Sequence, residues 1–245
     1  MKIKTMHFKL MAAIAVAALL GACAKSPQDQ ADQIDPELRA MYSATVDGEV
    51  VIPAVPDKYL SERNKRQLVS YQTKEKPGTI VVDPYARFLY LVMGDGEAMR
   101  YGVAVGDQGR GFSGTGTIPF TRSWPRWTPT QNMLKRDPAL YEPHRAGMEG
   151  GIENPLGARA LYLFQNGRDT LYRIHGTNYP WSIGQATSSG CIRLFNQDIL
   201  DLHERVRVGA KVVVLSKKDS GKGTGQWAAR NAAPTTPTEP EGGSS

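Results

Sequence analysis

The segment TIVVDPYARFLYLVMGDGEAMRYGVAV at residues 79–105 decides the fold class of this chain. Thr79–Val82 and Phe88–Met93 are β-branched and aromatic runs, and the turn composition Asp83–Ala86 separates them. A second, Gly-rich turn leads into another such run at Met99–Val105. Three consecutive strands joined by short turns are typical of an antiparallel sheet.

More strands follow downstream. Ala158–Phe164 and Thr170–Ile174 are joined through Asn166-Gly167, which is a strong hairpin signal. Lys211–Leu215 is predicted as a closing strand. We therefore expect one mostly β domain over residues 77–215, a sandwich or mixed sheet with a few short helices.

Short helical patterns and an aromatic segment lie between the strands. The polar region Gln131–Arg145 is predicted to be partly helical, and Asn196 offers an N-cap to a helix that ends near Arg207. Trp124 and Trp127 flank an arginine. They either line a binding groove or belong to a lid packed on the sheet.

The segment Gly106–Gly116 is Gly-rich and contains a literal G-x-G-x-x-G at Gly109–Gly114. A dinucleotide fingerprint requires a helix to begin there, whereas the chain continues as Thr115–Pro119. We therefore expect a flexible loop and no dinucleotide site.

Residues 1–22 have the pattern of a secretory signal, with a lysine-rich start and the apolar run Leu10–Leu20. This run is too short to span a membrane. Small residues directly before Cys23 resemble a bacterial lipoprotein signal, and this resemblance implies that Cys23 is acylated. An ordinary cleaved signal followed by a chance cysteine is the alternative. By resemblance to lipoproteins of two-membrane bacteria, Ala24 after the cysteine implies delivery to the outer membrane, so we expect an exported, lipid-anchored protein of the periplasm.

Residues 23–76 are predicted to be a tether and N-terminal extension. Scattered prolines favour a linker up to about residue 56, with one helical turn at Pro36–Met41. The charged segment Lys58–Gln67 is a candidate short helix, and Leu68–Thr73 a candidate strand. Residues 216–245 are rich in Lys, Gly, Thr and Pro, and we expect them to be disordered.

The charge of the chain points to no nucleic-acid partner. The formal net charge is +6, and it falls to +3 without the three lysines of the signal. No block of basic residues occurs.

Cys191 and His175 are the candidate reactive pair. The chain has two cysteines, so acylation of Cys23 leaves Cys191 as an unpaired thiol in an exported protein. A small buried side chain is the alternative role for Cys191. His175 ends a predicted strand, and the glycines and proline of the following loop let the chain fold back. An imidazole then activates a thiol.

Ser189 and Gly190, directly before Cys191, suit an oxyanion pocket built from consecutive backbone N–H groups. A zinc site from His175, Cys191 and either His144 or His203 lacks paired ligand spacing. We therefore expect no metal and no other cofactor.

The motif His-Gly-Thr-Asn at 175–178, followed by Ser-Ser-Gly-Cys-Ile-Arg at 188–193 and an Asn-x-Asp, resembles the active-site motif of the L,D-transpeptidases, the YkuD domain family. Thr79–Asp83 and Asn154–Gly157 fit the same pattern, so the resemblance covers about residues 77–215. Ser189 departs from it, since many members have His at that position.

The resemblance implies a role for each matching residue. Cys191 is the nucleophile and His175 the base, and the carbonyl of Gly176 fixes the imidazole tautomer. Ser189 and Gly190 complete the oxyanion pocket with Cys191.

Four further residues are candidate substrate contacts. Arg193 either stabilises charge on the substrate or forms a structural ion pair. Asn178 and Trp181 contact substrate, or else they serve turn formation and packing. Trp127 belongs to the candidate lid that keeps water out.

The implied reaction is acyl transfer on peptidoglycan. The cysteine is acylated by a tetrapeptide stem with release of D-Ala, and the acyl group passes to an amine of a second stem, a lipoprotein or an outer-membrane protein. Carbapenem acylation is expected by the same resemblance. Two alternatives remain open: hydrolysis of links between peptidoglycan and protein, and an inactive lipoprotein that binds the wall.

Overall fold

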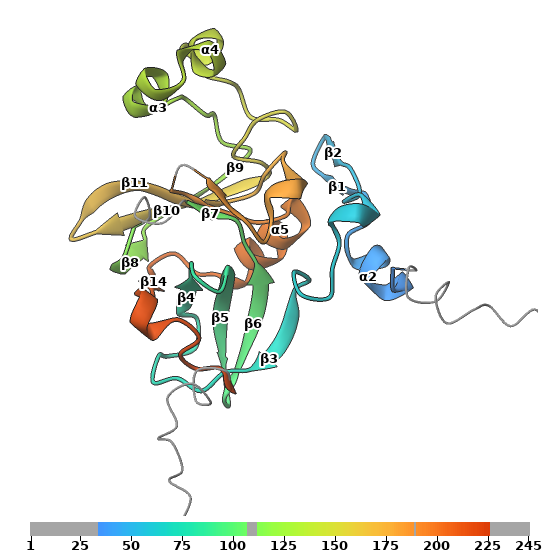
Figure 1. Ribbon diagram of the computed structural model, residues 1–245, viewed down its shortest axis with the longest axis vertical. Helices are drawn as coiled ribbons and strands as arrows, with labels where there is room; N and C mark the ends of the chain where they lie inside the picture. Colours follow the sequence, from blue (N-terminus) through green and yellow to red (C-terminus); the bar gives the residue numbers. More distant parts are fainter. Residues whose placement is uncertain (1–33, 107–111, 189, 226–245) are drawn as a thin grey trace, which may run out of the picture. The chain divides into compact units, whose positions relative to one another are not determined.

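The computed structural model describes residues 34–106, 112–188 and 190–225 (Figure 1). A ten-stranded mixed sheet with the order β13-β11-β10-β8-β14-β4-β5-β6-β3 dominates it, and β9 adds to β10. Its strands are β3 (Gln67–Ser70), β4 (Ile80–Asp83), β5 (Phe88–Gly94), β6 (Glu97–Gly102), β8 (Gly114–Ile118), β9 (Thr121–Ser123), β10 (Arg159–Gln165), β11 (Arg168–His175), β13 (Ile192–Arg193) and β14 (Ala210–Val214). The expected mostly β class is confirmed.

The predicted strands pair as neighbours. β4, β5 and β6 form an antiparallel meander, in which Leu91 pairs with Ile80 on one side and Met99 on the other. β10 and β11 form the predicted hairpin. Asn166 and Gly167 at its turn have φ values of 50° and 74°, which is the conformation that this dipeptide favours in tight hairpins.

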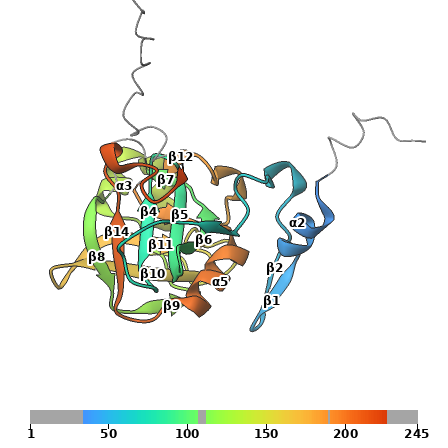
Figure 2. The same ribbon diagram turned by 90° about the horizontal axis from the view of Figure 1, so that it is seen from below.

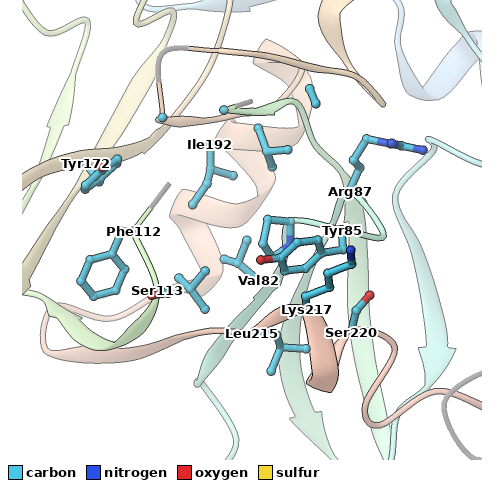
Figure 3. A pocket seen from close by; sticks show the side chains of 16 residues that line it. Val82, Tyr85, Arg87, Phe112, Ser113, Tyr172, Ile192, Leu215, Lys217 and Ser220 are labelled. Carbon is cyan, nitrogen blue, oxygen red and sulfur yellow. The ribbon is translucent and has the colours of Figure 1, made fainter. Parts of the chain in front are cut away.

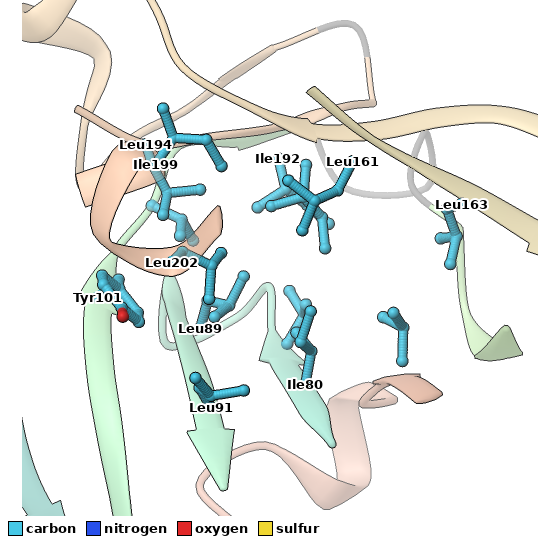
Figure 4. Close-up of a cluster of buried hydrophobic side chains, with 14 of the residues drawn as sticks. Ile80, Leu89, Leu91, Tyr101, Leu161, Leu163, Ile192, Leu194, Ile199 and Leu202 are labelled. Atoms are coloured by element: carbon cyan, nitrogen blue, oxygen red, sulfur yellow. The ribbon is translucent and has the colours of Figure 1, made fainter. Parts of the chain in front are cut away.

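The core lies between two layers of strands. Figure 4 shows side chains of β4 and β5 facing those of β10 and α5 (Asn196–Arg205). The largest fully buried ones include Leu89, Leu91, Leu161 and Leu163. α5 buries Ile199 and Leu202 in the same cluster, so the helix following the candidate cysteine is fixed to the core.

The N-terminal cap of α5 differs from the expectation. Phe195 is the N-cap, and no side chain caps the helix there. Asn196 is the first helical residue, and its side chain bonds to neighbouring segments instead. The helix end near Arg207 is close to the observed end at Arg205.

The described part of the N-terminal region, residues 34–76, is folded against the domain, contrary to the tether prediction (Figure 2). Its elements are α2 (Pro36–Met41), β1 (Thr45–Asp47), β2 (Val50–Ile52) and the 3-10 turn η1 (Asp57–Tyr59). Leu38, Tyr42, Val55 and Leu60 are buried here in one cluster with Phe195. The apolar side chains are far apart in the sequence, so they form no periodic pattern, and the scattered prolines favoured a linker instead. Their burial against the domain stabilises this region.

Two local predictions in this region have clear outcomes. The helical turn at Pro36–Met41 is confirmed, and the side chain of Asp35 accepts a hydrogen bond from the backbone of Glu37 as its N-cap. The candidate helix at Lys58–Gln67 is wrong, since this stretch contains only the end of η1 and the first residue of β3.

Residues 216–225 are also folded, so the prediction of disorder is wrong for this part of the tail. The 3-10 turn η4 (Lys217–Asp219) brings Ser220 to Asp83. The buried Asp83 carboxylate accepts hydrogen bonds from Ser220 Oγ at 3.0 Å and Gly221 N at 2.5 Å. The rest of the tail (226–245), the signal (1–22) and Cys23 lie outside the described residues.

The Gly-rich segment enters a strand, not a helix. β8 begins at Gly114, so the literal G-x-G-x-x-G lacks the helix that dinucleotide binding requires. A side chain at Gly116 would come within 2.5 Å of Phe164 O and 2.8 Å of Leu163 Cδ1, so close strand packing requires glycine there. The flexible loop expected over Gly106–Gly116 is wrong at its two ends, since Gly106 belongs to β7 (Val105–Gly106) and Gly114–Gly116 to β8. Residues 107–111 lie outside the described residues.

The segment before β10 is partly helical, as expected. It contains α3 (Gln131–Arg136), α4 (Pro138–Tyr141) and η2 (Glu142–His144), which extend away from the sheet in Figure 1. Across the described parts of the chain, every helix is too short or too polar to cross a membrane.

Candidate active site on strands β11 and β13

The register of β11 and β13 places the candidate pair on one face of the sheet. The strands run parallel, with Ile174 opposite Ile192 and His175 opposite Arg193. Ile174 and Ile192 are buried in the core. Because side chains alternate along a strand, His175 and Arg193 project from the other face. One step back in the same register, Cys191 lies beside β11 on this outer face.

His175 is a buried, neutral imidazole. Its side chain is 3% exposed, and Nδ1 lies 2.5 Å from the carbonyl oxygen of Gly176. A carbonyl only accepts, so Nδ1 carries the proton, and Nε2 is left with its lone pair. Burial, assisted by the charge of Arg193, lowers the pKa of His175 to about 3. The ring is therefore unprotonated on Nε2 at neutral pH.

Cys191 is a partly buried thiol next to β11. Its Sγ lies 4.0 Å from the carbonyl oxygen of Leu171. Burial raises the pKa of the thiol, while the Arg173 backbone and the charges of Arg173 and Arg193 oppose that shift. No hydrogen bond joins this sulfur to the His175 ring among the described residues. His175 ends β11 and Cys191 directly precedes the neighbouring strand β13, and the Sγ atom contacts the Leu171 carbonyl of β11.

The turn before Cys191 is held by a residue that the sequence did not single out. Ser188 Oγ donates to the carbonyl of Cys191 at 2.6 Å and accepts from Gly190 N at 3.1 Å. Gly190 has a φ of 130°, which requires glycine. In this state its N–H is engaged by Ser188 rather than free for an oxyanion. Ser189 lies outside the described residues.

Arg193 faces Cys191 without a carboxylate partner among the residues described. Burial lowers its pKa, and Cys191, Tyr141 and Tyr179 are the neighbours that oppose this. Within that part of the chain, no Asp or Glu forms an ion pair with it. Arg173, by contrast, pairs with Asp169 at 2.7 Å. The structural ion pair considered for Arg193 is thus not found there.

The other candidate contacts are spread around this face. Trp181 is 48% exposed and lies beside Tyr179, with ring centroids 6.1 Å apart. Asn178 Nδ2 donates to the Glu153 carbonyl at 2.9 Å, and its buried Oδ1 has no hydrogen-bond partner among the residues that the structure describes. Trp127 is half-buried in residues 124–149, the segment that contains α3 and α4 and is called the α3–α4 segment below.

The two tryptophans of the aromatic segment have different surroundings. Trp127 packs near Tyr141 and His144, with centroids 6.3 Å and 6.2 Å away. Trp124 instead donates its indole N–H to Asp47 at 2.8 Å. Trp124 therefore joins the N-terminal region to the domain, whereas Trp127 belongs to the segment that carries Tyr141 towards Arg193.

Two buried asparagines fix the backbone around His175. Asn196 Oδ1 accepts from Ala158 N at 3.0 Å, and its Nδ2 donates to the carbonyl of Thr177 at 3.1 Å. A Cβ on Gly176 would overlap Asn196 Oδ1, so this position requires glycine. In the sequence, the Asn-x-Asp pattern after the cysteine motif was the only feature that pointed to a role for Asn196 near the site.

Asn154 performs a similar function for the α3–α4 segment. Its Nδ2 donates to the carbonyls of Pro125, Met148 and Glu149 at 3.0–3.2 Å, and its Oδ1 accepts from Leu156 N at 2.8 Å. The Leu156 backbone in turn hydrogen-bonds His175. The Asn154–Gly157 motif therefore connects the candidate lid to the imidazole.

A cavity of about 600 Å³ reaches the residue before Cys191. Figure 3 shows Tyr172 and Ile192 on one side of it and Val82, Leu215 and Lys217 on the other. Gly190 is part of its lining. The cavity thus opens on the core side of β11 and β13, opposite the face of His175.

Residues 77–214 match the family model described as the L,D-transpeptidase catalytic domain, YkuD. The chain belongs to this family. It is 34% identical over 142 residues to the Escherichia coli protein named Probable L,D-transpeptidase YbiS, and the match covers 57% of this chain and 45% of YbiS. The chain therefore spans less than half the length of that curated relative.

Two solved structures are also similar to this L,D-transpeptidase family member. An L,D-transpeptidase from Mycobacterium smegmatis is 17% identical, with a TM-score of 0.41, and covers 56% of this chain and 58% of its own. A Brucella melitensis protein described as a probable carnitine operon oxidoreductase caia is 53% identical, with a TM-score of 0.44, and covers 65% of this chain and 99% of its own. The oxidoreductase description belongs to that protein.

Among the described residues of this L,D-transpeptidase family chain, the two other histidines contact partners other than Cys191. His203 is on α5, with Nε2 3.0 Å from Thr121 Oγ1, and His144 packs near Trp127. Among the residues described, no three His, Cys, Asp or Glu side chains are grouped to hold a metal ion.

Proposed function

We propose that this chain is a peptidoglycan L,D-transpeptidase with Cys191 as nucleophile and His175 as general base. The observation that carries the proposal is the buried imidazole of His175, whose Nδ1 lies 2.5 Å from the Gly176 carbonyl oxygen, on the same sheet face as the free thiol of Cys191. Family membership supplies the reaction class. A protein that only binds the wall has no need of this pair.

In the first half-reaction, the sulfur of Cys191 attacks the carbonyl of the third residue of a tetrapeptide stem. The thiol proton passes to His175 Nε2, a C–S bond forms, and the amide bond to the terminal D-Ala breaks. The departing amine takes the proton from the imidazole. Rotation of the Cys191 side chain away from Leu171 O is required before this attack.

In the second half-reaction, a neutral amine attacks the thioester. A C–N bond forms as the C–S bond breaks, and the amine proton returns to the thiolate through His175. Arg193, facing Cys191 without a described carboxylate partner, favours negative charge on the stem or on the tetrahedral intermediate. Exclusion of water by the segment carrying Trp127 and Tyr141 favours transfer over hydrolysis.

The proposal includes export and lipidation. The signal pattern of residues 1–22 and the small residues before Cys23 support acylation of Cys23 and anchoring in the outer membrane, facing the periplasm. Mass analysis of the membrane fraction for diacylglyceryl-modified chain, with Cys23→Ser as control, tests this part.

The reaction is tested by incubating the full chain with a tetrapeptide stem and reading the products by mass spectrometry. Release of D-Ala and formation of a 3–3 cross-linked dimer are expected, and Cys191→Ala abolishes both. Release of D-Ala with a tripeptide as the only other product would instead establish a hydrolase. A Cys191→Ala variant that still releases D-Ala would refute the nucleophile.

A further inference from the structure

Residues 124–149, the α3–α4 segment, form a loop whose two ends meet. The backbones of Trp127 and Met148 exchange two hydrogen bonds, with N···O distances of 2.9 Å and 2.8 Å. Beside them, Arg126 pairs with Glu149. The segment therefore leaves the domain and returns to it through these four residues, called the neck, and α3 and α4 lie beyond the neck (Figure 1).

One buried side chain holds the two sides of the neck together. Asn154 is 1% exposed, and the two N–H bonds of its Nδ2 are shared among the carbonyls of Pro125, Met148 and Glu149 at 3.0–3.2 Å. Pro125 directly precedes the first side of the neck, and the other two residues form its second side. Carbonyls that lose their donor in a buried site cost free energy. This amide therefore opposes opening of the neck.

Asn154 also begins a tight turn, called the Asn154 turn, that lies against the backbone after His175. Its Oδ1 accepts from Leu156 N at 2.8 Å, and its carbonyl accepts from Gly157 N at 3.0 Å. A Cβ on Gly157 would lie 2.7 Å from backbone atoms of residues 176–177. The Leu156 backbone hydrogen-bonds His175 itself. The turn and the segment that carries the base are therefore in direct contact.

The α3–α4 segment reaches Arg193 on the face that carries His175. Tyr141, the last residue of α4, lies close enough to raise the pKa of the Arg193 guanidinium against the effect of burial. Arg193 is opposite His175 in the register of β11 and β13. A shift of the segment at its neck therefore changes the position of Tyr141 relative to Arg193, whereas a shift of the Asn154 turn moves the backbone beside the base.

We propose that Asn154 is a positioning residue that couples the α3–α4 segment to the backbone beside His175, and this inference rests on the proposed transfer function. Its Nδ2 holds the segment, and with it Tyr141, beside Arg193, where the segment excludes water from the acyl-enzyme. Its Oδ1 holds the Asn154 turn against the backbone that follows His175. Loss of the amide releases both contacts at once.

Water and the amine compete for the same thioester carbonyl. With water, a C–O bond forms as the C–S bond breaks, one water proton passes through His175 to the thiolate, and a tripeptide stem with a free carboxyl group is released. With the amine, the cross-linked product forms instead. The ratio of the two products therefore reports how well the segment excludes water.

Three variants of the full chain separate the two contacts. Asn154→Ala removes both. Asn154→Asp keeps the acceptor for Leu156 N and loses the N–H donors to the neck. Gly147 directly precedes the neck with a φ of 91°, and a Cβ there would lie 2.9 Å from the Trp127 carbonyl oxygen. Gly147→Ala therefore disturbs the neck and leaves the Asn154 side chain unchanged.

The product ratio is measured by mass spectrometry with a tetrapeptide stem as both donor and acceptor. The ratio of cross-linked dimer to tripeptide is expected to fall about fivefold in all three variants, as for loss of a buried hydrogen bond. The kcat for D-Ala release is expected to fall about tenfold in Asn154→Ala alone, because only this variant also displaces the base.

The control is Leu38→Ala, which removes a buried side chain of α2 outside the neck and the Asn154 turn. It is expected to leave the product ratio unchanged. A role of Asn154 confined to folding would lower the yield of active protein in Leu38→Ala and Asn154→Ala alike, without changing the product ratio in either.

Backbone hydrogen exchange of the full chain measures the same coupling in the absence of substrate. The amides of Trp127 and Met148 report on the neck. The Gly176 amide, bonded to the Arg159 carbonyl at 3.1 Å, reports on the backbone beside the base. Asn154→Ala is expected to accelerate exchange at both places, and the other two variants at the neck alone.

Wild-type exchange at either place in Asn154→Ala, or a wild-type product ratio in all three variants, overturns the proposal. Equal acceleration in Leu38→Ala also overturns it, because it would show opening of the whole domain. If Asn154→Ala does not fold, wild-type exchange at the neck in Asn154→Asp overturns the proposal in the same way. A wild-type chain that forms only tripeptide, while exchange changes as expected, would contradict the proposed transfer function and support the coupling by Asn154.

Discussion

The position of His175 at the end of β11 determines its protonation state. The ring is buried, and the Gly176 carbonyl accepts from Nδ1. Burial disfavours the imidazolium, which lowers the pKa of His175 to about 3. The imidazole therefore stays unprotonated over the whole neutral range, unlike a solvent-exposed histidine with a pKa near ~6.5.

The pH dependence of acylation follows from this shift. The base is lost only when the imidazole becomes protonated, so kcat/KM for D-Ala release is expected to stay flat from pH 7 down to about pH 5. Stopped assays across that range measure it. A half-maximal rate near pH 6.5 would show instead that the ring titrates as an exposed imidazole does.

The same shift affects stability. The unfolded chain binds a proton at His175 below about pH 6.5, whereas the folded chain does so only near pH 3, so the stability present above pH 6.5 is lost as pH falls between these values. Urea unfolding of wild type and His175→Gln at pH 7 and pH 4.5 measures this. The variant is expected to lose less free energy of unfolding on acidification. An equal loss in both proteins would contradict the lowered pKa.

Asn196 holds the backbone segments next to His175 in place. Asn196→Ala leaves the Ala158 N–H and the Thr177 carbonyl unpaired in a buried site, at a cost of about 1–3 kcal/mol in unfolding free energy. The D-Ala release rate is expected to fall more than tenfold with little change in KM for the stem. Asn196→Asp retains the acceptor for Ala158 N and is expected to recover part of both losses. Wild-type kcat in Asn196→Ala would exclude the positioning role.

At the scale of elements, regular strands were predictable and irregular ones were not. The runs at Thr79–Val82 and Phe88–Met93 correspond to β4 and β5. Short runs of β-branched and aromatic side chains between turns favour strands over helices. β13 has two residues, too few for any periodicity. Its parallel pairing with β11 therefore could not be predicted, although it places Cys191 beside the base.

The N-terminal elements are part of the folded domain and should contribute to its stability. Leu38 of α2 is 3% exposed, so Leu38→Ala is expected to lower the unfolding free energy by about 2–4 kcal/mol. Val51 of β2 is 62% exposed, and Val51→Ala is the matched control with a change within about 0.5 kcal/mol. Urea denaturation measures both. Equal, small effects would mean that residues 34–60 are the tether that composition indicated.

At the scale of the whole molecule, the chain joins a shared catalytic domain to an extension that closes over one side of it. The motif residues at 175–178 and 188–193 indicated the family, because their order and spacing are specific. Ser188 and Gln197 were not predicted, since a single serine or glutamine has no pattern that reveals its hydrogen bonds. Packing of distant segments determines their roles.

The most direct test of the account is the intact mass of the full chain during reaction with a tetrapeptide stem. Rapid acid quenching is expected to trap an adduct equal to the stem minus D-Ala, and peptide mapping is expected to locate it at Cys191. Cys191→Ala should carry no adduct. An adduct at another residue, or stem turnover by the Cys191→Ala variant, would contradict the assignment of the Cys191 thiol, directly before β13, as the nucleophile.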